Sequence, residues 1–340
     1  MTATDMYRSR DAAQCRRGVE MGLRRPICIA WLVGALLLQA QAAEAESVSQ
    51  SQLMRSETNI QAPKSGYVLV LNEIFSRAVD ENRFDKRSQT GAFDTTFFWD
   101  ARTLATNNEL QFYIDRDMTL KDGLKPGLSP FGRISKDGGV TITARPTPEI
   151  LKDRTGQPYI SGLLTTYHSF AFTFGYVEIR AKIPKGAGLW PALWLLRRDK
   201  GKVGEIDIME NLGQKPDYLM SSLHWDSDGD GVPDQKALLV RRKTNDLSAD
   251  FQTYGLDWNE QDITIYLNGM KLGSAPTPEP LKKPMYLLMN LAVGGWAGKP
   301  DPSAFPAEFA IDYLRVWQDP KALRNYKGAE LAAGGALPHK

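Results

Sequence analysis

Three acidic residues stand close together in the segment GEIDIME, and their spacing could support acid–base chemistry. In an extended strand successive side chains point to opposite faces, so Glu205 and Asp207 share a face and Glu210 points away from it. One extra residue at Ile208 or Met209, a β-bulge, would turn Glu210 onto the face of the other two acids. The apolar residues between the acids are typical of a buried strand, although a surface strand with a chance run of acids is the alternative.

Three carboxyl groups on one face favour the hydrolysis of glycosidic bonds. In a retaining glycosidase two carboxyl groups lie about 5 Å apart. One attacks the anomeric carbon, and the other protonates the leaving oxygen and later activates water. Three like charges in one groove cannot all stay ionised cheaply, so at least one acid should have a raised pKa and hold a proton near neutral pH.

The preceding segment, residues 173–196, predicts a strand, a glycine-containing loop and a second strand. In its first strand Glu178 and Arg180 belong to a polar face that alternates with an apolar one. In its second strand Trp190 and Trp194 share a face. Tryptophans at this spacing are common in protein cores, but aromatic rings also stack on the apolar faces of sugars. Their place directly before the acidic strand favours sugar binding.

Five segments resemble glycoside hydrolase family 16 in the same order along the chain. They are GYVEIRAKIPKGAGLWPALWLL, GEIDIMENLG, SSLHW, LLMNLAVGGW and FAIDYLRVWQ, within residues 67–318. The resemblance implies an all-β fold, a concanavalin A-like β-jelly-roll sandwich of two antiparallel sheets with a carbohydrate cleft across the concave sheet. It also implies that Glu205 is the nucleophile, Glu210 the acid/base and Asp207 the residue that modulates them. The Glu-x-Asp-x-x-Glu spacing looks like the laminarinase-like branch, whereas the lichenase-type branch has one residue fewer between the last two acids.

The same resemblance implies a set of substrate-binding residues. They are Glu178, Arg180, Trp190, Trp194, His224 and Trp296 and, from the weaker match NNELQFY, Asn108, Glu109 and Gln111.

The loop just before the acidic strand is basic where laminarinase-like members often carry a tryptophan. It contains Arg197, Arg198, Lys200 and Lys202. We hypothesise that these side chains favour an acidic or acyl-substituted polysaccharide through charge-assisted contacts. A solvated loop without a binding role is the alternative.

Two places could hold a structural calcium ion. The segment DSDGDGVPD resembles part of the Asp-rich loops of thrombospondin type 3 and dockerin modules, and its candidate ligands are Asp226, Asp228, Asp230 and Asp234. Ala237 at the twelfth position cannot bind, and an acidic surface turn is the alternative. The second place is Asp312, which the family resemblance implies as a calcium ligand, with a locally bonded edge-strand residue as the alternative. No cofactor is expected for catalysis.

The N-terminus has the features of a secretory signal. Arg24 and Arg25 precede an apolar run at 27–38 that is too short for a comfortable membrane span, and Ala-Glu-Ala at 43–45 is a small-x-small cleavage site. Met21 is a candidate for the true start. Both cysteines, Cys15 and Cys28, precede the expected cut, so disulfides and thiolate metal sites are excluded for the mature chain.

The remaining organisation points to a single secreted, monomeric domain, periplasmic or extracellular. We expect a signal peptide at 1–45, a flexible leader at 46–66, a catalytic domain at 67–319 and a C-terminal tail at 320–340. Strand signals include residues 263–267, followed by an Asn268-Gly269 hairpin turn, and residues 309–317. The net charge of +2 and the absence of any nucleic-acid signature argue against a nucleic-acid partner.

The predicted function is therefore a retaining endo-β-glycanase acting on a β-glucan or a bacterial exopolysaccharide. Two alternatives stay open: a transglycosylase with the same covalent intermediate, and a carbohydrate-binding protein without turnover. A serine hydrolase is disfavoured because the chain has only His168, His224 and His339 and no G-x-S-x-G elbow.

Overall fold

The computed structural model describes residues 61–85, 91–199, 202–323 and 325–327, and from Ala62 onward the chain forms one compact unit. The predicted signal peptide, the candidate start and most of the predicted leader lie outside the described residues. Within the described part of the chain no helix has the length and apolar character needed to cross a membrane.

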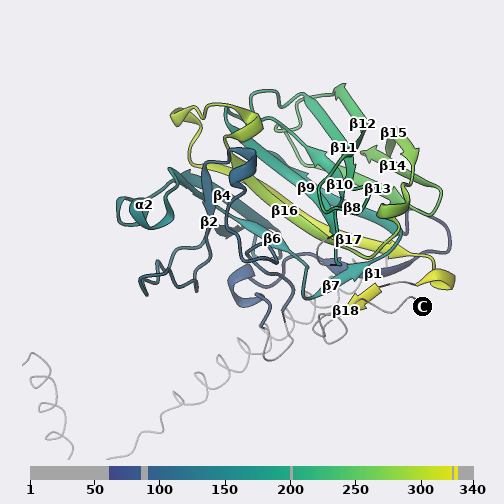
Figure 1. Cartoon of the computed structure of the whole chain (residues 1–340), viewed down its shortest axis with the longest axis horizontal. Coiled ribbons are helices and arrows are strands. Elements are labelled where there is room, and N and C mark those ends of the chain that lie inside the picture. The colour runs from purple at the N-terminus through teal and green to yellow at the C-terminus, as the bar shows by residue number, and fades with distance from the viewer. Residues whose placement is uncertain (1–60, 86–90, 200–201, 324, 328–340) are drawn as a thin grey trace, which may run out of the picture. The chain divides into compact units, whose positions relative to one another are not determined.

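The described residues form two large β-sheets (Figure 1). The first has the order β15 (Met270–Pro276), β14 (Asp262–Leu267), β13 (Gln252–Trp258), β8 (Gly175–Lys182), β17 (Ala307–Gln318), β4 (Val140–Pro146), β5 (Tyr159–Ser161) and β2 (Gln111–Tyr113), with β1 (Val68–Glu73) beside β17 and β3 (Phe131–Arg133) beside β4. The second has the order β12 (Gln235–Lys243), β11 (Tyr218–Trp225), β10 (Gly204–Glu210), β9 (Leu189–Arg197), β16 (Met285–Val293), β7 (Phe170–Phe172) and β18 (Asn325–Lys327), with β6 (Leu163–Thr165) beside β16. All these pairings are antiparallel except that of β2 with β5.

Helices are short and few among the described residues. They are α2 (Glu149–Thr155), at the left in Figure 1, and the 3₁₀ turns Val79–Glu81, Ala105–Asn107, Glu279–Leu281, Gly295–Ala297, Pro302–Ala304 and Pro320–Ala322. The predicted all-β sandwich of two antiparallel sheets is therefore confirmed.

One hydrophobic core lies between the two sheets, because alternate residues of each strand point toward the other sheet. On β8, Val177 and Ile179 are fully buried there, and Leu193 on β9 and Met289 on β16 join the same cluster. The other face of the second sheet carries polar and aromatic residues instead. That face is where the predicted acids can meet a ligand.

The structure confirms the strand and the turn that were predicted from neighbouring residues alone. Asn268 and Gly269 have φ values of 50° and 76° and join β14 to β15, as a type I′ hairpin requires. The predicted strand at 309–317 is β17. The domain boundaries stay predictions. Within the predicted C-terminal tail β18 pairs with β7, and Lys64 in the predicted leader forms an ion pair with Asp257 of β13 at 2.6 Å.

Candidate active site

A β-bulge interrupts β10 between its second and third acids. Against β9, Asp207 pairs with Trp194 and Glu210 with Ala192, so three steps along β10 match two along its neighbour. The pairing with β11 shifts by one residue over the same stretch. The extra residue is Ile208, which has no partner on β9 and is fully buried in the core. The predicted bulge is thus present, and it brings all three acids to the outer face of the second sheet.

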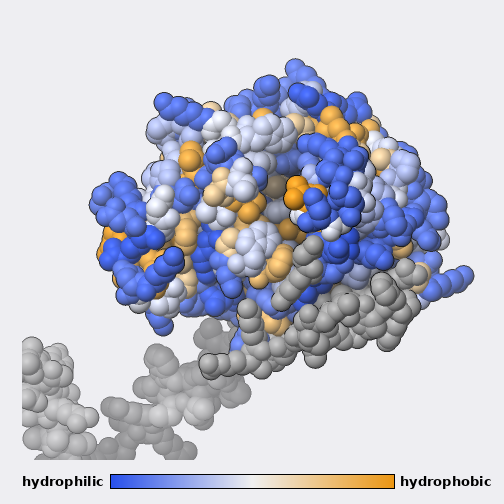
Figure 2. All heavy atoms as spheres, in the orientation of Figure 1, coloured by the Kyte–Doolittle hydropathy of each residue, from blue (hydrophilic) through white to orange (hydrophobic). Residues whose placement is uncertain are grey.

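The acids line a cleft of about 550 Å³ on that face, visible as a hollow flanked by apolar side chains in Figure 2. Its lining is of three kinds. The charged and polar residues are Glu205, Asp207, Glu210, Glu109, His224, Lys236, Asn107 and Asn290; the aromatic ones are Phe97, Trp99, Trp190, Trp194 and Trp296; and the smaller apolar ones are Leu104, Ala192, Leu196, Val203, Pro233 and Ala292.

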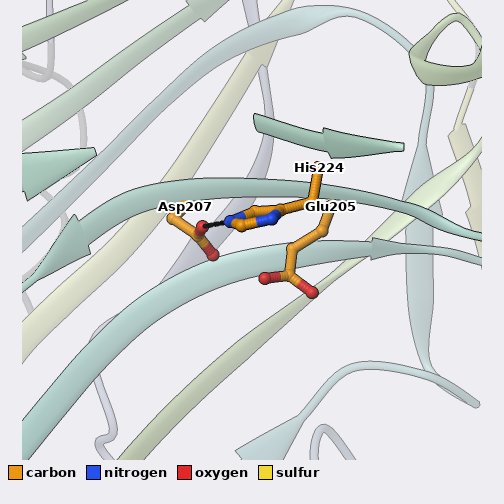
Figure 3. Close-up of side chains that lie close together, drawn as sticks. All are labelled: Glu205, Asp207 and His224. Atoms are coloured by element: carbon orange, nitrogen blue, oxygen red, sulfur yellow. Dashed lines mark ion pairs between the residues drawn. The ribbon is translucent and has the colours of Figure 1, made fainter. Parts of the chain in front are cut away.

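Short polar contacts orient Asp207 and Glu210. Ser222 Oγ donates to Asp207 Oδ2 at 2.7 Å, and His224 Nε2 lies 3.3 Å from the same oxygen. In Figure 3 the imidazole and the Asp207 carboxylate point toward one another, and Glu205 lies beside them. Trp190 Nε1 donates to Glu210 Oε1 at 3.0 Å. Each acid therefore has its own neighbours, and the three are not equivalent.

Burial and mutual repulsion shift the protonation of the two glutamates. Burial raises the pKa of Glu210 to about 8, with a further rise from the charge of Asp207, although the hydrogen bond from Trp190 works in the opposite direction. Burial raises the pKa of Glu205 well above its ordinary value, and Asp207 again adds to the effect. Lys236 lowers the pKa of both glutamates. Near neutral pH the cleft therefore keeps at least one carboxyl group protonated.

Five of the predicted substrate-binding residues line the cleft: Glu109, Trp190, Trp194, His224 and Trp296. Hydrogen bonds and ring contacts hold the tryptophans in place. Trp194 Nε1 donates to Asn290 Oδ1 at 2.7 Å, and the rings of Trp190 and Trp296 meet edge to face with centroids 5.7 Å apart. Their role in sugar binding remains a prediction, and their position agrees with it.

Asn108 and Gln111 do not line the cleft, so that part of the prediction needs correction. Gln111 is fully buried, where its Nε2 donates to Glu109 at 2.5 Å and its Oε1 accepts from the backbone N–H of Val293. Asn108 ends a 3₁₀ turn in a left-handed conformation with φ 54°. Its neighbour Asn107 takes the lining position and donates to Glu109 at 3.2 Å.

The prediction that Glu178 and Arg180 line the cleft is wrong. Both lie on β8, in the other sheet, and alternate with residues that enter the core. Their side chains therefore point away from the cleft. Tyr313 donates its hydroxyl to Glu178 at 2.8 Å, and Arg180 forms an ion pair with Asp312 at 2.6 Å. The connection between β8 and β9 crosses from one sheet to the other, which the sequence of the two strands does not reveal.

The basic-loop hypothesis stays a prediction, and the residues of the loop have different surroundings. Arg197 pairs with Asp199, and Arg198 is buried with its guanidinium 3.7 Å above the ring of Tyr167. Lys202 is exposed, and Lys200 lies outside the described residues. The lysine that lines the cleft is Lys236 on β12, opposite His224 in register. Strand pairing brings Lys236 beside the acids, so no local pattern in the sequence indicates its place in the cleft.

Phe97 and Trp99 were missed as well. They come from a segment before the first recognised motif, and the run TFFWD was the only available signal. The structure brings this segment against the acidic sheet, since the ring of Phe97 meets that of Trp194 edge to face at 6.2 Å.

The two calcium predictions have different surroundings. Carboxylate oxygens of Asp226, Asp228 and Asp230 lie within 4.8 Å of one another, a grouping of hard oxygen donors that fits calcium. Asp234 instead accepts the backbone N–H of Ser227 at 2.8 Å. Asp312 belongs to no acidic group of this kind among the described residues, and its carboxylate faces Arg180.

Comparison with known proteins identifies related sequences and folds. The sequence pattern described as Glycosyl hydrolases family 16 matches residues 94–315. Endo-1,3-1,4-beta-glycanase ExsH of Rhizobium meliloti (strain 1021) is 37% identical over 73% of this chain and 52% of its own length. Endo-1,3-1,4-beta-glycanase EglC of the same organism is 34% identical over 80% of this chain and 56% of its own length.

One solved glucanase structure has a similar fold. SCLam, described as a non-specific endo-beta-1,3(4)-glucanase from family GH16, superposes with a TM-score of 0.61 at 29% identity, over 76% of this chain and 94% of that one. The chain spans about half the length of these two rhizobial glycanases, ExsH and EglC.

Proposed function

Because the chain belongs to glycosyl hydrolases family 16, we propose that it is a secreted endo-acting glycanase that hydrolyses internal bonds of a β-1,3- or β-1,3-1,4-glucan, or of a related bacterial exopolysaccharide, with retention. The observation that carries this proposal is the bulge in β10, which turns three acids into one cleft lined by tryptophans. The names of the relatives agree with it.

The mechanism follows from the roles that the family resemblance implies for the two glutamates. Glu205 as a carboxylate attacks the anomeric carbon while Glu210 gives its proton to the leaving glycosidic oxygen. A water molecule then loses a proton to Glu210 and displaces Glu205 from the same carbon. The raised pKa of Glu210 suits its role as the acid. Asp207, held by Ser222 and His224, modulates the charge of both.

Substitution of the two glutamates tests this assignment. We expect Glu205→Gln and Glu210→Gln each to lower kcat by a factor of about 10² to 10⁴ on laminarin or mixed-linkage glucan. Glu178→Gln is the matched control, since that glutamate lies on the other sheet, and it should keep wild-type activity. With an aryl β-glycoside, whose leaving group departs without a proton, azide should restore turnover to Glu210→Ala by attacking the glycosyl-enzyme and releasing a β-glycosyl azide. Near-normal turnover by Glu205→Gln would contradict the proposal.

We propose that Lys236 also favours an anionic substrate. Among the cleft-lining residues of the described chain, Lys236 is the only lysine or arginine, and it stands beside His224. A carboxylate or acidic acyl substituent on the polysaccharide could contact it. We expect Lys236→Gln to raise the KM for an anionic exopolysaccharide at low salt more than the KM for neutral laminarin. Equal changes on both substrates would exclude this preference.

Secretion is proposed from the arginines, apolar run and Ala-Glu-Ala site at the N-terminus. Sequencing the N-terminus of protein recovered from the cell envelope or medium checks it. A mature chain beginning near residue 46 is the expected result, and an uncleaved chain retained in the cytoplasm would contradict it.

A further inference from the structure

Trp99 is an exposed aromatic side chain on a wall of the cleft, and the family resemblance gave it no role. Among the cleft-lining residues of the described chain, only Trp99 and Trp296 are large apolar side chains more than a third exposed, at 45% and 50%. An exposed aromatic ring in a cleft can stack on the apolar face of a sugar.

A tight turn presents the Trp99 ring. Asp100 donates its backbone N–H to the carbonyl of Phe97 at 2.9 Å and adopts a left-handed conformation with φ 63°. The backbone N–H of Phe97 in turn donates to Ala101 at 3.2 Å. The turn is thus closed on both sides, and Trp99 lies within it.

Neighbouring rings hold the indole in one orientation. The ring of Phe97 is stacked on it at 4.7 Å with an interplanar angle of 11°, and the ring of Phe98 meets it edge to face at 4.7 Å. Phe97 also contacts Trp194, which pairs with Asp207 in the acidic strand. Trp296, by contrast, contacts Trp190. The two exposed tryptophans therefore belong to different aromatic groups within one cleft.

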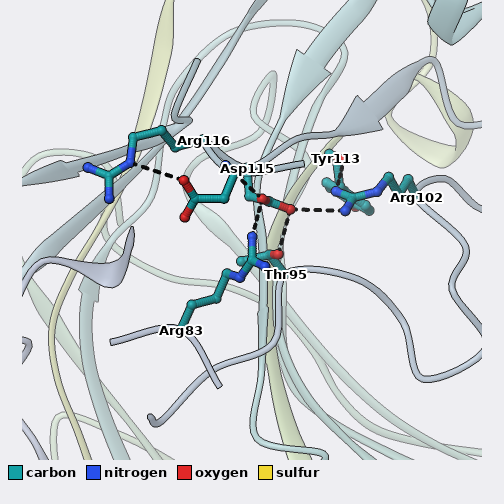
Figure 4. A network of polar contacts seen from close by, with 7 residues as sticks. Arg83, Thr95, Arg102, Tyr113, Asp115 and Arg116 are labelled. Atoms are coloured by element: carbon teal, nitrogen blue, oxygen red, sulfur yellow. Dashed lines mark hydrogen bonds and ion pairs between the residues drawn. The ribbon is translucent and has the colours of Figure 1, made fainter. Parts of the chain in front are cut away.

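A buried acid anchors the segment that carries the turn. Asp115 is 1% exposed, and its carboxylate forms ion pairs with Arg83 and Arg102 (Figure 4). It also accepts a hydrogen bond from the hydroxyl of Thr95 at 2.9 Å. Thr95 and Arg102 flank the turn on either side. A loop anchored in this way loses little conformational freedom when a ligand binds.

On the basis of the proposed function, we propose that Trp99 forms an additional subsite that stacks on the apolar face of a pyranose unit. The unit is a β-linked hexose of the same polysaccharide chain, remote from the bond that is cut. Its binding makes the enzyme favour long chains over short ones, because only a long chain reaches both the acids and Trp99.

The dependence of activity on chain length tests this subsite. We expect Trp99→Ala to lower the ratio of kcat/KM on a glucan polymer to kcat/KM on the shortest cleaved oligosaccharide by about three- to tenfold. Trp99→Phe should restore most of that ratio. Met270→Ala, at another exposed apolar residue, on the β14–β15 hairpin, is the matched control and should leave the ratio unchanged. An unchanged ratio in folded Trp99→Ala, judged by its Tm, would overturn the proposal.

Binding measurements separate this proposal from the proposed hydrolysis. Glu210→Gln, with and without Trp99→Ala, is titrated with laminarin and with mixed-linkage glucan by calorimetry. Weaker binding of the double variant supports the subsite even if the wild type hydrolyses neither polymer. Equal binding by both variants, or no binding by either, overturns it.

Discussion

Glu210 and Glu205 are buried beside another acid, which disfavours their charged forms. The proposed acid–base chemistry depends on this effect. Burial and the neighbouring Asp207 raise the pKa of both, while Lys236 lowers both. Because each group feels the charge of the others, their protons leave in linked steps. A protonated acid and an ionised nucleophile can then coexist over a limited range of pH.

A pH–rate profile checks this arrangement. We expect kcat/KM to rise with pH on an acidic limb above pH 4.5, the ordinary value for a glutamate, as Glu205 loses its proton. It should fall on a basic limb near pH 8 as Glu210 loses the proton that it must donate. Lys236→Gln removes a positive charge that favours both carboxylates, so both limbs should move to higher pH. A constant rate across pH 8 would contradict the role of Glu210.

Sequence reasoning was sufficient for the acids because their chemistry depends on residues close together in the chain. It failed for Lys236, which reaches the cleft through strand pairing, and for Trp99, whose loop is anchored by Arg102 and Asp115 outside any recognised motif. Gln111 shows the opposite error. Its position in a matching motif suggested a ligand contact, but the fold uses it to hold Glu109.

The bulge in β10 converts an irregular spacing of acids into a shared face. Without it, Glu210 would enter the core and Met209 would be forced toward the cleft. The pairs on both sides of the bulge, Asp207 with Trp194 and Glu210 with Ala192, are two residues apart on β9. A regular strand could therefore make the same pairs with one residue fewer.

Deleting Ile208 tests that argument. The shortened segment Glu-Ile-Asp-Met-Glu alternates regularly, so all three acids stay on the cleft face and measurable hydrolysis should remain. Loss of a fully buried side chain should lower the free energy of unfolding by about 2 to 5 kcal/mol, measured by urea denaturation. Deleting Ile206 is the control, because it places Glu205 and Asp207 on opposite faces and should abolish hydrolysis. Complete inactivity of folded enzyme lacking Ile208 would show that the bulge does more than set the faces.

The loop between β11 and β12 is a candidate calcium element beside the cleft, which Pro233 lines. Asp226 already accepts backbone N–H groups of Gly229 and Gly231 at 2.6 and 2.7 Å. We propose that calcium joins these carboxylates, and we expect a chelator to lower the Tm by about 4 °C, corresponding to roughly 1 to 2 kcal/mol. Asp228→Ala should remove this response. Equal Tm values with and without chelator in the wild type would exclude the site.

At the scale of the whole molecule, the sandwich separates two tasks. The second sheet presents the cleft, while the first carries its own polar outer face with the contacts of Glu178 and Arg180. Alternation along a strand predicts that one face is polar, but it does not say which sheet the strand joins. The fold class was therefore predictable from the alternating pattern. The sheet to which β8 belongs was not predictable from it.

The cleft should also make the stability of the whole domain depend on pH. A carboxyl group with a raised pKa in the folded state stabilises the fold fully below its unfolded pKa, and this contribution is lost as pH rises through its folded pKa. For Glu210 the window runs from its ordinary value of 4.5 to about 8. Glu210→Gln keeps the size of the side chain without its charge, so its Tm should match the wild type near the acidic end and exceed it by a few degrees above about pH 8. Thermal unfolding of both proteins across this range measures the difference, with Glu178→Gln as the control. A constant difference in Tm at all pH values would mean that folding does not raise the pKa of Glu210. That result would contradict its proposed role as the acid.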